Sequence, residues 1–501
     1  MTAGNDIMAR PRFAPAAELT ALLRSPGTVI REGLAGIVTM LALIPEVISF
    51  SFVSGVDPKV ALFASVVLAL VMSILGGRPA MVTAAAGSVA LVIGPMVRAH
   101  GTAYVLPAVI LAGVVQVAFG TTGLARMTRF IPRSVMLGFV NALGILIFSA
   151  QVPHVIGTNP AVYALFAVTA VITLLLPRLT TTVVPAALVA IVVATAIAIF
   201  AHLQVPHVGG DAAASAGLPG LTPLLVPLNL ATLQIIWPTA LSVAFVGLLE
   251  TLLTARLVDD LTRTPSNKGK ECWALGIANI LAGCWGGIGG CAMIGQSIVN
   301  VKIGGGRTRL STAVAALALL AMLTSLDGLM ARIPMVALAA VMMIVAIRTV
   351  NWRSIRPGTM KRMPLSETVI MLLTVGVTVA TGNLALGILS GVGLAIIVFA
   401  RQAAQGTIAH RTLLGDGDAV RYVLHGPLFF GSSHDLHEHF TCAADPTDVT
   451  IDLTHSPIWD ASSIAALDAI EAKYRGLGSV VTLVGLDERS AAFRQRLTGI
   501  L

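Results

Sequence analysis

Long apolar runs separated by short polar segments dominate the chain from Gly33 to Ala400. A helix that crosses a bilayer needs about 20 mostly apolar residues, and broken helices need fewer. The pattern predicts fourteen spans in two sets of seven. They lie near 33–53, 60–76, 80–98, 103–120, 134–152, 161–176 and 183–201, and near 237–257, 271–287, 291–303, 311–326, 334–350, 366–381 and 384–400.

Beyond Arg401 no apolar run is long enough to span a membrane, and strand-like and helix-like patterns alternate. Strands are predicted at 419–424, 448–453 and 479–484, and amphipathic helices at 432–441 and 461–475. The fold class is therefore a polytopic α-helical membrane protein with a small cytoplasmic α/β domain. We expect a cytoplasmic N-terminal segment at 1–32, a transmembrane domain at 33–401 with repeats at about 33–201 and 237–400, and the α/β domain at 410–501.

Composition and charge support this assignment. Hydrophobic residues make up 56% of the chain and charged residues 11%, and the mean hydropathy is +0.89. With the N-terminus inside, only Lys59, Arg98 and Arg332 of the 32 basic residues fall on the outer side. The net charge of +8 is thus a topology signal and not a nucleic-acid patch. Both termini are predicted to be cytoplasmic, with basic inner loops contacting anionic lipid.

No cofactor, metal site or enzymatic constellation is expected. The four cysteines, Cys272, Cys284, Cys291 and Cys442, have no CxxC spacing and are interpreted as buried thiols. The segment HDLHEH at 434–439 matches no strong zinc signature and is interpreted as a solvated helix. No Ser/His/Asp set lies near the middle of the predicted membrane domain.

Two acidic residues lie deep in predicted spans, Glu46 in LIPEVISFSF and Glu250 in GLLETLLTA. Each lies in the first span of its set of seven. A charged side chain there costs roughly 2.5 kcal/mol or more on insertion scales, and such residues commonly mark ion pathways. The alternative is a structural role, with Glu46 snorkelling or paired to an arginine and Glu250 compensated by Arg256.

The third span of each set is short and rich in small residues, reading AAGSVALV at 85–92 and IGQSIVNV at 294–301. Since seven is odd, the two repeats have opposite orientations. We expect two half-helices whose N-termini meet near the bilayer middle, where free N–H groups and helix dipoles attract an anion. The glycines of AGCWGGIGGCAM suit a non-helical approach, and close packing of small residues is the alternative.

Several stretches resemble the SulP family of anion transporters, the sulfate-permease group that includes prestin. They are LIPEVISFSFVSGVDP, FVGLLETLLTARLVDDLT, NKGKECWALGIANILAGCWGGIGG and GQSIVNVKIGGGRTRLST. The C-terminal strand with Asp452, followed by WDASS, is similar to a STAS domain. The resemblance implies seven-plus-seven inverted repeats, a core domain that moves against a gate domain, secondary active transport by alternating access, and a homodimer.

The resemblance also assigns site residues. Glu46 stands where the family has Gln, Phe50 is the usual aromatic, and Gln296 replaces an Arg that many members carry. Glu250 and Thr254 match a coupling-cation site of sodium-dependent relatives. The two anion-binding stretches correspond to Ala86, Gly87 and Ser88 and to Met293, Ile294 and Gly295.

The replacements at Glu46 and Gln296 change the charge of the predicted anion site. Burial disfavours an ionised carboxyl, and a protonated Glu46 would leave a hydrogen-bond donor facing the anion. We expect Glu46 to carry the coupling proton, with Glu250 as the second candidate. The likeness is nearest to proton-coupled bacterial transporters of fumarate and related dicarboxylates, which places the chain in a bacterial-type inner membrane. Proton- or sodium-coupled uptake of bicarbonate or sulfate, or an anion channel or exchanger, is the alternative.

In STAS domains that are switched by phosphorylation, a serine opens the helix after the DSSG-like turn. Ala461 stands at that position, which argues against direct phospho-switching, while Ser462 and Ser463 remain candidate acceptors. The other interpretation is that Asp460 or Ser462 caps the helix.

Overall fold

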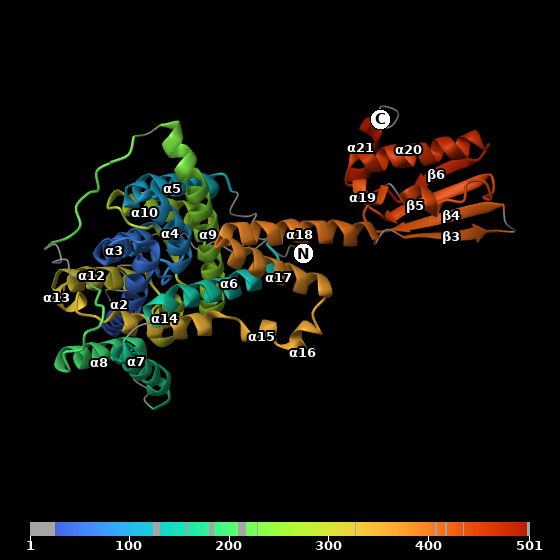
Figure 1. The fold of residues 1–501 in the computed structure, drawn as a ribbon. Coiled ribbons are helices and arrows are strands. Elements are labelled where there is room, and N and C mark those ends of the chain that lie inside the picture. Colours follow the sequence, from blue (N-terminus) through green and yellow to red (C-terminus); the bar gives the residue numbers. More distant parts are fainter. Residues whose placement is uncertain are drawn as a thin grey trace. The chain divides into compact units, whose positions relative to one another are not determined.

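The computed structural model describes residues 26–123, 131–156, 159–179, 185–208, 217–227, 229–325, 327–405, 408–415, 418–433 and 435–497. Most of the predicted N-terminal segment and His434 of the HDLHEH segment lie outside the described residues. The chain divides into two compact units, Met1–Gly391 and Val392–Leu501 (Figure 1).

Each of the fourteen predicted spans overlaps a helix in the described part of the chain. The spans at 80–98 and 291–303 do so only in part, since they include strand residues and their helices begin at Gly87 and Ile294. In the first set these are α2 (Pro26–Ser54), α3 (Pro58–Leu75), α4 (Gly87–His100), α5 (Val105–Thr121), α6 (Arg133–Gln151), α7 (Pro160–Leu179) and α8 (Ala186–Phe200). In the second set they are α9 (Leu230–Thr262), α10 (Lys268–Cys284), α11 (Ile294–Ile298), α12 (Arg309–Ser325), α14 (Met335–Thr349), α17 (Leu365–Thr381) and α18 (Leu384–Gln405). Seven described helices are long and apolar enough to cross a membrane unaided.

Short helices complete the membrane unit. The segment after α11 continues as a π-helical turn at Val299–Ile303. Turns of 3-10 helix lie at Thr102–Tyr104 and Val152–His154, and short α-helices are α13 (Asp327–Met330), α15 (Trp352–Ile355) and α16 (Pro357–Met360).

Two three-residue strands precede the half-helices α4 and α11. β1 (Thr83–Ala85) leads into α4, β2 (Gly290–Ala292) leads into α11, and the strands pair antiparallel with Ala84 opposite Cys291. A Cβ on Gly290 would lie 2.1 Å from the carbonyl oxygen of Ala84, so the crossing requires glycine there. Because both strands are buried and satisfy each other's backbone groups, non-helical chain is tolerated inside the membrane unit.

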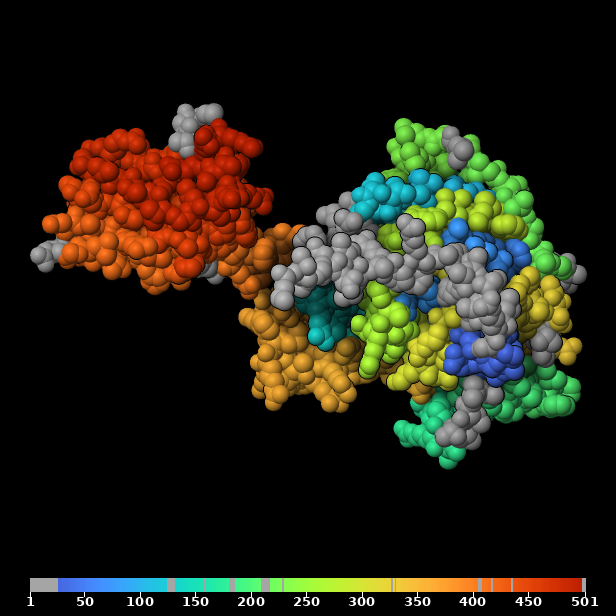
Figure 2. All heavy atoms as spheres, turned by 180° about the vertical axis from the view of Figure 1, so that it is seen from behind, coloured from blue at the N-terminus to red at the C-terminus, as the bar shows by residue number. Residues whose placement is uncertain are grey.

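The helices pack in two groups. α2, α3, α4, α5, α9, α10 and α12 pack on one another, as do α6, α7, α8, α14 and α17. α2 and α12, blue and yellow in Figure 2, lie side by side. Gly113 on α5 and Gly276 on α10 each face the other's carbonyl oxygen so closely that a Cβ would lie 2.5–2.6 Å from it, which lets these two helices approach.

A buried polar cluster fixes the loop before β1. The Arg78 guanidinium lies 3.1 Å from Asp259 on α9 and donates to the Thr264 carbonyl oxygen at 2.9 Å. The Glu271 carboxyl on α10 accepts the backbone N–H of Arg78 at 2.8 Å. These bonds tie the loop to α9, to the segment just after α9 and to α10, so the entry to β1 is held from several sides.

The C-terminal unit contains a four-stranded sheet in the order β3-β4-β5-β6. Its elements are β3 (Ile408–Leu414), β4 (Ala419–His425), α19 (Phe430–Ser433), a 3-10 turn at Asp435–His439, β5 (Asp448–His455), α20 (Ala461–Gly476), β6 (Val480–Val484) and α21 (Glu488–Leu497). β3 pairs antiparallel with β4, whereas β4, β5 and β6 are parallel. Tyr422, Leu424, Ile451, Leu467 and Tyr474 lie in the core.

The predicted helix at 432–441 is wrong, since the described residues of that stretch are the end of α19, a 3-10 turn at Asp435–His439 and two residues outside any helix. Leu436 and Phe440 are anchored in the core, which ties the chain into a tight turn instead of a regular amphipathic helix. The sequence interpretation also missed β3 and α21. Most residues of both elements are exposed, so their polarity hides the periodicity that marks the other elements.

Candidate functional site

The short helices α4 and α11 start side by side because β1 and β2 cross immediately before them. α4 begins at Gly87 after Ala86, and α11 begins at Ile294 after Met293. Neither preceding residue supplies a side-chain cap, so the first-turn N–H groups keep no such partner. Two helix N-termini with free donors and positive dipole ends therefore face one region of the molecule.

A cavity of about 410 Å³ lies at these N-termini. It brings together most residues that the sequence singled out, namely Glu46, Phe50, Ala86, Gly87, Ser88, Glu250, Met293, Ile294, Gly295 and Gln296. Thr254 does not line it. Eight further lining residues escaped the sequence interpretation: Phe139, Val140, Leu143, Ile147, Ile298, Val345, Arg348 and Thr349. Most of these lie on α6 and α14, outside the stretches that resemble the transporter family.

Glu46 faces the cavity from α2, and its carboxyl group contacts the side-chain amide of Gln296 on α11. Gln296 is buried, with 2% of its surface exposed. One turn after Glu46, the Phe50 ring packs against Gly87, where a Cβ would lie 2.5 Å from Phe50 Cε1. No atom stands within 4 Å of a Cβ built on Gly295, so that residue borders open space.

Glu250 is held by two donors instead of a cation. The Ser88 hydroxyl and the Cys291 thiol both donate to Glu250 Oε2, the thiol at 3.0 Å. Thr254 Oγ1 donates to the carbonyl oxygens of Glu250 and Ala292 at 2.8 and 3.1 Å. Arg256 is exposed, and the described residues contain no ion pair between it and Glu250, so the alternative in which Arg256 compensates Glu250 is wrong.

Arg348 brings a positive charge to the cavity. It stands one residue before the end of α14, and Val345 and Thr349 line the wall beside it. Among the described residues it is in no ion pair, and its side chain is exposed. Gln296 and Arg348 thus line the same cavity from different helix groups.

The α20 N-terminus of the C-terminal unit is capped by Asp460. Its carboxyl group accepts the backbone N–H of Ser463 at 3.1 Å and that of Phe430 at 2.5 Å. Ser463 is buried and donates its hydroxyl to Asp460 at 2.9 Å, whereas Ser462 is exposed. The capping interpretation is confirmed for Asp460, and Ser462 is the accessible hydroxyl of the turn.

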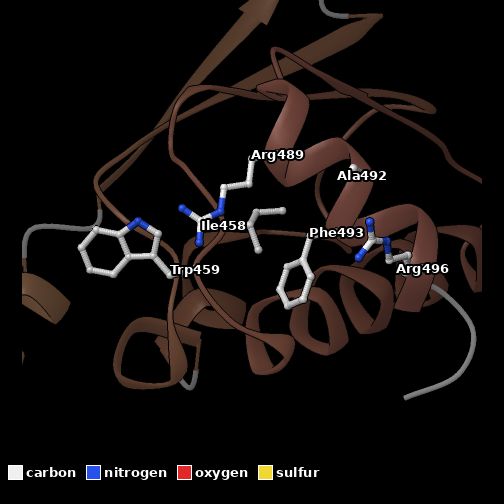
Figure 3. Close-up of a pocket in the computed structure, with 6 residues that line it drawn as sticks. All are labelled: Ile458, Trp459, Arg489, Ala492, Phe493 and Arg496. Atoms are coloured by element: carbon white, nitrogen blue, oxygen red, sulfur yellow. The ribbon is translucent and has the colours of Figure 1, made fainter. Parts of the chain in front are cut away.

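Asp452 on β5 is held in the ionised form. Hydrogen bonds from Thr454, together with the Arg421 guanidinium at 2.5 Å, lower the pKa of Asp452 to about 2. The same unit carries a cavity of about 240 Å³ beside α21. Figure 3 shows Arg489 and Arg496 flanking Phe493 there, with Trp459 and Ile458 on the facing loop. Its arginines are exposed, so the cavity has no buried polar side chain positioned to bind a ligand.

The described residues contain no group of three or more His, Cys, Asp or Glu side chains placed to hold a metal ion. The fold, with its paired half-helices and an appended α/β domain, is that of a helical membrane transporter with a STAS domain. The sequence profile of the sulfate permease family matches residues 32–177 and 160–374, and that of the STAS domain matches residues 412–498. The chain belongs to the sulfate permease family of anion transporters.

Two relatives align with most of the chain. The putative sulfate transporter YbaR of Bacillus subtilis is 44% identical over 94% of this chain and 97% of its own. The bicarbonate transporter BicA of Synechocystis is 27% identical over 85% of this chain and 82% of its own.

Solved structures agree on the fold. The transmembrane domain of a cyanobacterium bicarbonate transporter BicA matches with a TM-score of 0.64 and 26% identity, over 72% of this chain and 97% of that one. Murine Slc26a9, an anion transporter in the inward-facing state, matches with a TM-score of 0.84 at 16% identity, over 98% of this chain and 92% of that one. The sequence-based assignment to the family and to a STAS domain is confirmed.

Proposed function

We propose that the protein is a proton-coupled symporter of fumarate or a related dicarboxylate that works by an alternating-access, elevator-like mechanism. The observation that carries this proposal is the cavity, where uncapped N-termini of α4 and α11 face Glu46. Free backbone donors and dipole ends supply the attraction for an anion. Glu46 supplies a titratable group at the same place.

The cavity walls support an organic anion. Phe50, Phe139, Leu143, Ile147 and Val345 give the cavity a largely apolar lining. Such walls pack against a carbon skeleton but cannot replace the water lost by a compact, strongly hydrated anion. A dicarboxylate presents its charges at two ends and an apolar middle, which suits donors at the half-helices and aliphatic side chains between.

Glu46 provides the coupling step in this proposal. When protonated, it removes a negative charge from the cavity and can donate a hydrogen bond to the anion. When ionised, it repels the anion. Because one site binds both, proton and anion enter together and free energy passes from the proton gradient to the anion.

Uptake of bicarbonate or sulfate is the second candidate, because relatives that match most of the chain carry those names. Glu250 with Thr254 would then be the candidate cation site. In either case we place the transport path in residues 33–401 of an inner-membrane homodimer with cytoplasmic termini. Residues 410–501 support folding or regulation without forming the path.

The test is uptake into proteoliposomes containing the full chain, under an imposed proton gradient, with labelled fumarate, succinate, bicarbonate or sulfate. The proposal expects saturable dicarboxylate accumulation that collapses when a protonophore is added. Accumulation of bicarbonate or sulfate alone would favour the second candidate. Non-saturating flux that never exceeds the external concentration would indicate a channel.

A further inference from the structure

The charges that line the cavity are unevenly distributed between the two helix groups. Glu46 and Glu250 are the acidic lining residues, and both stand in the group that contains the half-helices. Arg348 is the one Lys or Arg among the described lining residues, and it stands on α14. An anion in this cavity therefore meets backbone donors from one group and a guanidinium from the other.

α14 is built into the second group. It packs mainly on α6 and α7 and reaches the first group chiefly through α2. Arg348 lies near the C-terminal end of α14, the end that the charge pattern predicts to be cytoplasmic. If the half-helices carry the anion relative to α14, the distance between the anion and Arg348 must change during the cycle.

We propose that Arg348 is an anion-binding residue that contacts the transported anion from α14 and acts on the cytoplasmic face of the cycle only. This inference rests on the proposed transport function. It adds that the cytoplasmic and external faces bind the anion with different affinities. Arg348 attracts the anion while the cavity is open toward the end of α14 that carries it. Once the half-helices have moved away, the guanidinium no longer contributes.

The charge of Arg348 also replaces the one missing at Gln296. The two side chains line one cavity from opposite helix groups. An arginine on α11 would travel with the anion and stabilise it at both faces. An arginine on α14 stays behind and makes the two faces unequal, so cytoplasmic affinity exceeds external affinity.

The variants are Arg348→Gln, Arg348→Lys and the double variant Arg348→Gln/Gln296→Arg, with Arg353→Gln as the matched control. Arg353 is an exposed arginine on α15 that does not line the cavity. Sidedness is set in proteoliposomes by blocking the protein copies of one orientation. The readout is the apparent KM of each face for the anion that the wild type transports best.

Arg348→Gln is expected to raise the KM of the cytoplasmic face about tenfold, equivalent to about 1.4 kcal/mol of binding, and to leave the external KM unchanged. Arg348→Lys should stay within about twofold of wild type, since it keeps the charge. The double variant should recover the cytoplasmic KM and also lower the external one. Arg353→Gln should change neither.

Equal changes on both faces, or no change in Arg348→Gln, would overturn the inference. If wild-type protein shows no saturable anion uptake, the proposed function fails instead. Should Arg348→Gln not fold, Arg348→Cys can be labelled after reconstitution, with treated wild type as the control for the native cysteines. A cationic thiol reagent should then restore cytoplasmic affinity and an anionic one should not, and identical effects would contradict the role of charge.

Discussion

The contact between Phe50 and Gly87 allows a quantitative test of the cavity. In Gly87→Ala the new Cβ would lie 2.5 Å from Phe50 Cε1 and 2.8 Å from Cζ. Carbon atoms at ordinary contact are roughly 3.5–4.0 Å apart, so the ring must move by about 1 Å. Overpacking of a closed core costs about 1–3 kcal/mol, but here the ring can turn into the adjoining cavity at lower cost. The displaced ring would then occupy space that the anion needs.

The variant is therefore expected to fold and to lose anion affinity by tenfold or more, about 1.4 kcal/mol. Ligand-dependent thermal stabilisation of the purified protein measures this loss, since a ligand that binds only the folded state raises its stability. Phe50→Leu combined with Gly87→Ala should recover much of the affinity. Gly393→Ala on α18, whose Cβ would meet no atom within 4 Å, is the control. Wild-type affinity in Gly87→Ala, or no recovery in the double variant, would refute the geometry.

Three further outcomes are expected. Gly295→Val should fold normally and abolish anion binding in the same assay, because its side chain would project into open space beside the half-helix donors. Ser88→Ala should lower the free energy of unfolding by about 1–3 kcal/mol, since buried Glu250 loses one of its donors, and unchanged thermal unfolding would contradict this. The depressed pKa of Asp452 stabilises the STAS unit above pH 4, and this contribution is lost as pH falls toward about 2. Asp452→Asn should flatten that part of the pH profile. The measurement is the unfolding of the STAS unit as a function of pH.

The membrane unit was predictable from its sequence to a large extent because lipid imposes simple constraints. Apolar length located the fourteen helices, and the odd number per repeat predicted opposed half-helices. The glycines and alanines upstream of Gly87 and Ile294 indicated the non-helical approach. The antiparallel pairing of β1 with β2 was not foreseen, since three buried residues carry no periodic signal.

The wall opposite the half-helices could not be predicted. Phe139 and Val140 on α6 resemble any other apolar residues of a membrane helix. Arg348 sits where a basic residue ordinarily marks the inner end of a span, so its sequence position suggests topology and not a site. The packing of α14 against α6 and α2 brings it to the cavity. The hydrogen bonds of Glu250 to Ser88 and Cys291 likewise depend on the crossing of β1 and β2.

The most direct test of the account is the ratio of protons to anions carried by Glu46→Gln. Gln has the shape and the donor capacity of a protonated Glu but cannot release a proton. Proteoliposomes bearing this variant are expected to bind and exchange anion normally, with no internal acidification during entry and no uphill uptake under a proton gradient. Internal acidification at the wild-type proton-to-anion ratio would contradict the account and show that the proton travels by another residue.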